Sequence, residues 1–176
     1  MREIMREIED ALEAVVLARA YFHVEGQEPE AAALDLKLWK LLKRGSPLLR
    51  AEMAAQLRKR KDAPPRTIRA LACDPDPEIA GPILSASPAL SDVAIAEMAR
   101  CKEDVHLAAI ALRRNLSPKI SGILARRGGA AVLDALAKNR TASFTPDGRE
   151  IFERRLRIHR AATRGRTATA PVASPD

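Results

Sequence analysis

Residues 65–99 read PRTIRALACDPDPEIAGPILSASPALSDVAIAEMA and form three short apolar runs, each of which begins at a proline or at a residue that caps helices. Each run has room for roughly two to three helical turns. A helix this short cannot bury its apolar face alone, so neighbouring helices must cover it. The stretch therefore predicts short helices that stack side by side as antiparallel pairs.

The same pattern continues toward the carboxyl end of the chain. Apolar runs occupy residues 103–115, 116–126 and 130–139, and a charged amphipathic run over 146–162 is placed to close the array. The spacings from Pro64 to Pro88 to Pro118 are 24 and 30 residues, which is in the range of helix-pair repeats. We expect an all-α chain built as a right-handed α-solenoid, with Leu112 and Leu124 in its core.

Longer helices are predicted at the amino-terminal end. Apolar spacing indicates one helix over Arg2–Val24 and a second from Pro29 to Gly45, and Ser46 caps a third over Leu48–Lys61. The predicted organisation is a helix pair over 1–45, a repeat domain over 46–162 and a disordered tail over 163–176, where small polar residues and proline offer little to bury.

Composition supports helices and a cytoplasmic location. Of the 176 residues, 47% are hydrophobic and only 3% aromatic, which favours helices over sheets and suffices for one domain or a short repeat array. Neither a secretory signal nor an apolar membrane span is recognisable, so we expect no membrane association. Cys73 and Cys101 lack the spacing of a zinc site and are predicted to be small buried thiols.

Charge is arranged in bands along the chain. The formal net charge is +7, but residues 1–36, 37–70, 71–105 and 106–176 carry −6, +9, −5 and +9 respectively. This alternation indicates separate acidic and basic ridges, not one uniform surface for a polyanion.

Two stretches, LACDPDPEIAGPILSASPALSD at 71–92 and HLAAIALRRNLSPKISGILARRGGAAVLDALAKN at 106–139, carry a family resemblance. They resemble an uncharacterised, mainly alphaproteobacterial helical-repeat family catalogued as domain of unknown function number 2336. The likeness covers roughly residues 65–160. It implies a HEAT-like stack of helix pairs and a bacterial host, without implying an activity. The matching positions are Asp74, Ser87, Pro88, Leu90, Ser91, Arg113, Leu116, Ser117, Gly128 and Asn139, whereas Gly129 stands where members of the family often have an acidic residue.

Structural roles account for several of these positions. Asp74, Ser91 and Ser117 each precede a helical run and are predicted to accept a hydrogen bond from its first turn. Asn139 is predicted to tie the last carbonyls of its helix to the next loop. Arg113, at a helix end, is expected to meet exposed carbonyls or a carboxylate of a neighbouring repeat.

The sequence contains no recognisable catalytic machinery. Motifs for phosphate loops, dinucleotide sites, zinc proteases and serine hydrolases are missing, and nothing orients Cys101 and His106 as a nucleophile and its base. A HEAT-like DNA glycosylase would need a catalytic carboxylate and aromatic residues along a positive groove, and the sequence does not place that set. We therefore expect no enzyme, no cofactor and no metal.

Basic residues form the first candidate binding surface. They could contact a polyanion or an acidic partner, although aromatic residues for base stacking are few and a solvated charged ridge is the alternative. The candidates are Arg58, Lys59, Arg60, Lys61, Arg66, Arg69, Arg126, Arg127, Arg154, Arg155 and Arg157.

The first helix offers the second candidate surface. Ile4, Ile8, Leu12 and Val15 lie on one face with near-heptad spacing, so they could dimerise, receive a partner's helix, or simply pack on the second helix.

The leading hypothesis is a non-enzymatic scaffold or adaptor that binds a protein partner, in signalling or regulation. The alternative is a nucleic-acid-binding helical repeat.

Overall fold

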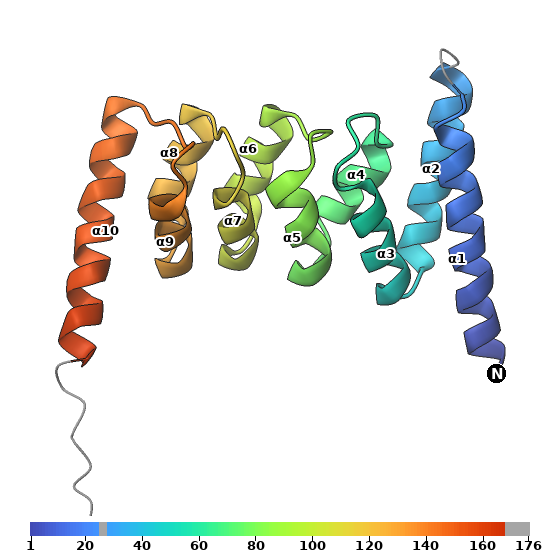
Figure 1. Ribbon diagram of the computed structural model, residues 1–176, viewed down its shortest axis with the longest axis horizontal. Helices are drawn as coiled ribbons and strands as arrows, with labels where there is room; N and C mark the ends of the chain where they lie inside the picture. The colour runs from blue at the N-terminus through green and yellow to red at the C-terminus, as the bar shows by residue number, and fades with distance from the viewer. Residues whose placement is uncertain (25–27, 168–176) are drawn as a thin grey trace, which may run out of the picture. The chain divides into compact units, whose positions relative to one another are not determined.

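The computed structural model describes residues 1–24 and 28–167, and within these ranges the chain is all-α, without a strand (Figure 1). The predicted fold class is confirmed. The first helices are α1 (Arg2–Tyr21), α2 (Glu28–Arg44), α3 (Pro47–Leu57), α4 (Pro65–Ala72), α5 (Pro77–Ala86) and α6 (Asp92–Cys101). They are followed by α7 (Asp104–Ala111), α8 (Pro118–Arg127), α9 (Ala130–Lys138) and α10 (Pro146–Thr167).

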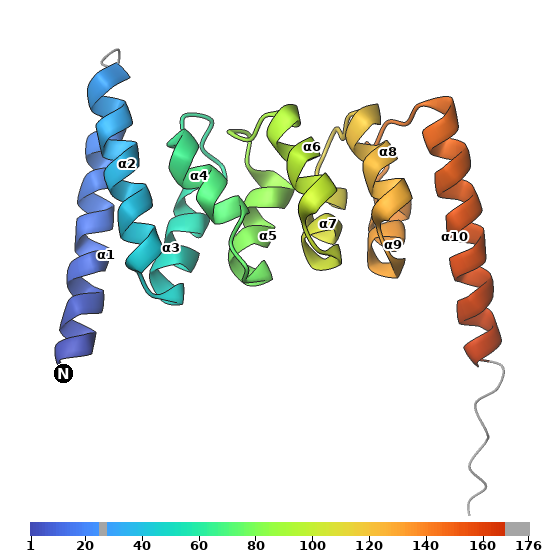
Figure 2. The same cartoon turned by 180° about the vertical axis from the view of Figure 1, so that it is seen from behind.

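The chain divides into two compact units, one over Met1–Met98 and one that begins at Ala99. In the first unit α1 packs antiparallel to α2, as two opposite views show (Figure 2), and α2 packs on α4 and α3 on α5. In the second unit α7 packs on α9 and α8 on α10. Helix pairs thus stack within each unit as predicted. The right-handed winding and the domain limits at 45 and 162 stay predictions.

Each unit has its own aliphatic core. Leu38, Met53 and Ile68 are buried in the first unit, and Ile110 and Leu124 in the second. Leu124 was predicted to be a core residue, and this is confirmed. The same prediction is wrong for Leu112, which is 60% exposed. Because α7 turns Leu107, Ile110 and Ala111 inward, the next residue after Ala111 falls on the outer face.

Three helix ends differ from the sequence-based expectation, and the first is that of α1, which ends at Tyr21 instead of Val24. The third helix ends at Leu57 instead of Lys61, and Arg58 is its C-cap. The last helix reaches Thr167, whereas the prediction ended it at 162 and began a disordered tail at 163. The added turn begins with Thr163 and Arg164, and arginine is a good helix former. The rest of the predicted tail, 168–176, lies outside the described residues.

Arginine side chains cap helix ends in the second unit. Arg127 donates from Nη1 to the Ala99 carbonyl and from Nη2 to the Lys102 carbonyl at the carboxyl end of α6. Arg155 on α10 donates from Nη1 to the Ala125 and Arg126 carbonyls of α8, at 2.7 and 2.8 Å. The last carbonyls of a helix lack partners within that helix, so each arginine stabilises an end that would otherwise depend on water.

Two further polar side chains join α7 to α9. The Asp104 carboxylate accepts a hydrogen bond from the Gly129 backbone N–H at 2.7 Å and so caps α9. A Cβ at position 129 would lie 2.6 Å from Asp104 Oδ2, so glycine permits this approach. Asn139 donates from Nδ2 to the carbonyls of Ala111, the last residue of α7, and of Arg113, just beyond it. These carbonyls are not, as predicted, those of its own helix.

The predicted caps are confirmed in part. The hydroxyls of Ser46 and Ser91 accept from Leu49 N–H and Ala94 N–H, both at 3.3 Å. Ser117 occupies the N-cap of α8, but its side chain makes no capping hydrogen bond. Asp74 does not cap α5. Asp76 does so instead, through Glu78 N–H at 2.9 Å.

The cysteine prediction is wrong for Cys101, which is exposed, while Cys73 is half-buried. The expected contact of Arg113 with a carboxylate stays a prediction.

Candidate functional site

Helix α1 turns two alanines inward and most of its large apolar side chains outward. Ala14 and Ala18 are buried. Ile4, Ile8, Leu12 and Val15 are between 40% and 62% exposed. Alanine allows two helix backbones to approach closely, so α1 packs in the first unit through Ala14 and Ala18, with Leu17 half-buried on the same face. The alternative that this face packs on the second helix is therefore wrong.

Two residues that the sequence analysis did not single out extend this face. Met5 and Val16 are 52% and 65% exposed. Met5, Ile8, Leu12 and Val15 follow the alternating spacing of a heptad repeat, which was the available signal. The α1 stripe consists of Ile4, Met5, Ile8, Leu12, Val15 and Val16.

A groove of about 280 Å³ runs along one edge of the α1 stripe, between α1 and α3. Its apolar lining includes Val15, Leu48 and Met53, and Leu48 is largely exposed. Glu7 and Glu52 add carboxylates, and no basic side chain of the described residues lines the groove. The groove is thus apolar with an acidic edge. The sequence does not mark Leu48 as a surface residue, because its position after Ser46 and Pro47 indicates only a capped helix start.

Ion pairs attach α1 to α2. Arg44 at the end of α2 binds Asp10 at 3.2 Å and Glu13 at 3.0 Å. Surface ion pairs of this kind add little stability, although they join the end of α2 to the middle of α1. They also neutralise two of the acidic groups of α1, so Glu7 and Glu52 set the charge at the groove.

The first basic group lies mostly in the loop after α3, where Arg58, Lys59, Arg60 and Lys61 are exposed. Arg60 is engaged within the chain: Nε and Nη2 donate to Asp62 at 3.1 and 2.7 Å, and the guanidinium lies 3.6 Å from the Phe22 ring centroid. The hydrogen bond from Arg60 holds the pKa of the Asp62 carboxyl below its usual range, and the pKa of Arg60 is raised in turn. Arg60 therefore anchors this loop near the end of α1.

The other predicted basic residues are divided between structural and exposed positions. Arg66 and Arg69 line one pocket of about 430 Å³, and Arg69 binds Glu97 at 2.7 Å. In the second unit Arg127 and Arg155 cap helix ends, and Arg126 reaches the Gly122 carbonyl at 3.4 Å. Arg154 and Arg157 on α10 are exposed. Contacts inside each unit therefore occupy part of each basic group.

The residues considered for catalysis occupy different environments. Cys101 is exposed, whereas His106 is buried with 5% exposure. Within residues 1–24 and 28–167, no cluster of three or more histidine, cysteine or acidic side chains could hold a metal ion. None of the helices described is both long enough and apolar enough to cross a membrane.

Comparison with known proteins finds one family. A family described as "Uncharacterised protein conserved in bacteria (DUF2336)" matches residues 79–168. No curated protein and no solved structure matches the chain significantly. The α1 stripe and its groove lie outside the matched segment.

Proposed function

The chain belongs to this uncharacterised bacterial family, and we propose that it is a non-enzymatic adaptor that binds a partner protein through α1. The exposure of the α1 stripe carries the proposal. Six large apolar side chains on one helix face are costly to leave in water, and such a patch is typical of a protein-binding surface. A role in signalling or regulation and a cytoplasmic location remain parts of the proposal.

The partner surface that fits best is an amphipathic helix with basic flanks. Apolar residues spaced three and four apart suit the apolar face of another helix. Glu7 and Glu52 at the groove would attract lysine or arginine beside that face. A second copy of α1 would bring its own Glu7 to the same groove, and the repulsion between like charges disfavours a homodimer.

A peptide-binding experiment tests this proposal. A fluorescein-labelled synthetic helix with leucine on one face and lysine beside it is titrated with the protein, and its anisotropy is measured. A matched peptide carries glutamate in place of lysine. We expect the lysine peptide to bind at least about tenfold more tightly, a difference of about 1.4 kcal/mol. Leu12→Gln should weaken binding, whereas Ile158→Gln, at an equally exposed site on α10, should not.

Two outcomes would contradict the proposal. Equal binding of both peptides would show that the acidic edge does not select the partner. A concentration-dependent dimer in sedimentation that Leu12→Gln abolishes would assign the α1 stripe to a second copy of the chain instead.

Nucleic-acid binding has less support. Arg60, Arg69, Arg127 and Arg155 are engaged with groups of the chain itself, which leaves fewer cations to neutralise phosphates.

A further inference from the structure

A second pocket in the first unit combines an aromatic wall with two cations. Its volume is about 450 Å³, and it lies among α2, α3 and the end of α4. Trp39 and Leu42 of α2 and Leu71 of α4 supply apolar surface, and Lys43 and Arg50 supply the positive charges. Pockets of this size with a few polar groups on an apolar lining are typical of small-ligand sites.

Lys43 is held against the aromatic wall. Its ammonium lies 4.2 Å from the centroid of the Trp39 ring, which is a cation–π contact. Trp39 is half-buried, and Lys43 is exposed. The contact places the ammonium beside the aromatic wall of the pocket, while the lysine side chain stays open to solvent.

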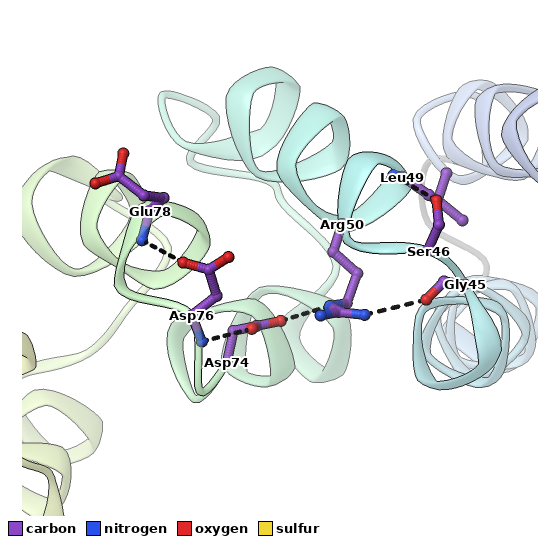
Figure 3. A network of polar contacts seen from close by, with 7 residues as sticks. All are labelled: Gly45, Ser46, Leu49, Arg50, Asp74, Asp76 and Glu78. Carbon is purple, nitrogen blue, oxygen red and sulfur yellow. Dashed lines mark hydrogen bonds and ion pairs between the residues drawn. The ribbon is translucent and has the colours of Figure 1, made fainter.

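Arg50 is oriented by the network drawn in Figure 3. Its Nε donates to Asp74 Oδ2 at 2.8 Å and its Nη1 donates to the Gly45 carbonyl at 3.0 Å. The side chain is 23% exposed, and Nη2 donates to no group in the described part of the chain. The two hydrogen bonds fix the guanidinium of Arg50, which lines the pocket, and leave Nη2 as a donor for a ligand.

The carboxylate of Asp74 does not prevent the two cations of the pocket from attracting an anion. Its side chain is 5% exposed, and its two oxygens already accept from Arg50 Nε and from Asp76 N–H at 3.0 Å. The charges of Asp74 and Arg50 balance each other, so Lys43 gives the pocket a net positive charge. A cationic ligand would find both carboxylate oxygens occupied and would be repelled by Lys43.

We infer that this pocket binds an aromatic group that carries a carboxylate. The aromatic body lies against Trp39, Leu42 and Leu71, and the carboxylate accepts from Arg50 Nη2 and pairs with Lys43. A small aromatic acid and a carboxyl-terminal aromatic residue of a peptide share this chemistry. The pocket is separate from the α1 groove, so the inference does not depend on the proposed function.

The single tryptophan of the chain provides the measurement. N-Acetylphenylalanine is titrated into the full chain while Trp39 emission is recorded with excitation at a wavelength that phenylalanine does not absorb. N-Acetylphenylalaninamide is the neutral control. We expect a saturable change with the acid and at least about tenfold weaker binding of the amide.

Variants identify the groups that bind the anion. Lys43→Gln removes an exposed charge without disturbing the core, and we expect it to weaken binding of the acid several-fold. Lys40→Gln, on the same helix but outside the pocket, is the matched control and should bind as the natural chain does. A peptide that ends in phenylalanine distinguishes the two sources of the ligand. If the peptide binds more tightly than N-acetylphenylalanine, the ligand is the carboxyl terminus of a peptide. If the two bind equally, the ligand is a small aromatic acid.

Three results would overturn the inference. They are an unchanged Trp39 emission at millimolar acid, equal binding of acid and amide, and equal loss of binding in Lys43→Gln and Lys40→Gln.

Discussion

Leu124 and Leu112 have opposite environments, although both come from apolar runs of the second unit. Leu124 is fully buried in α8, and Leu112 follows α7 with most of its side chain in water. We expect Leu124→Ala to lower the free energy of unfolding by about 2 to 5 kcal/mol, because it leaves a cavity. Leu112→Ala should cost less than about 1 kcal/mol. Urea unfolding followed by circular dichroism measures both, and equal losses would contradict the assignment.

For single residues, interactions between near neighbours in the sequence could be predicted, whereas interactions between residues far apart in the sequence could not. The caps at Ser46 and Ser91 depend on N–H groups three residues away, so the sequence identifies them. The choice between Asp74 and Asp76 depends on Arg50, which is 24 residues from Asp74. The α1 stripe shows the same limit, since spacing predicts an apolar face but not whether another helix covers it.

The arginine caps act between whole helices. Arg155 donates to the last carbonyls of α8, whereas its neighbour Arg154 is exposed. We expect Arg155→Ala to lower the free energy of unfolding by about 1 to 2 kcal/mol, because the cap and part of the stem's packing are lost. Arg154→Ala is the matched control and should change it by less than about 0.5 kcal/mol. Thermal unfolding of the two variants makes the comparison, and equal shifts would argue against a cap.

Helix starts were easier to predict than helix ends. The start of α4 at Pro65 and that of α10 at Pro146 coincide with prolines that suit a first turn. The end of α3 at Leu57 has no such signal, because the charged residues that follow are good helix formers. Contacts of Arg60 with Asp62 and Phe22 accompany the turn there, and a prediction from spacing does not include them.

At the scale of the whole molecule, helices pack on near neighbours in the sequence, so we expect a destabilising substitution to affect only the unit that contains it. Within each unit, helices pack on those one or two places along the chain. In such arrays stability is a sum of local terms. We therefore expect Leu124→Ala to speed amide hydrogen exchange in α7–α10 and to leave the rates in α1 and α2 unchanged. Exchange measured by mass spectrometry tests this, and an equal rise in α1 and α2 would indicate one cooperative unit.

The stacked helix pairs could be predicted because short apolar helices have no other way to bury their faces. The division after Met98 could not, because it falls inside α6 and no proline, glycine or change of composition marks it. The pocket at Trp39 was also beyond prediction, since its lining comes from three helices whose arrangement sets the approach of Arg50 to Asp74.

The arginine caps also bear on how genes for such chains can change in length. Arg127 and Arg155 are 28 residues apart, and each reaches back to carbonyls about the same distance before it. An in-frame duplication of one such period would copy a donor together with its acceptors. A duplication of half a period would place the arginine beside residues that are not its acceptors and leave the last carbonyls of a helix without a donor. We therefore expect tolerated insertions to be whole multiples of this period.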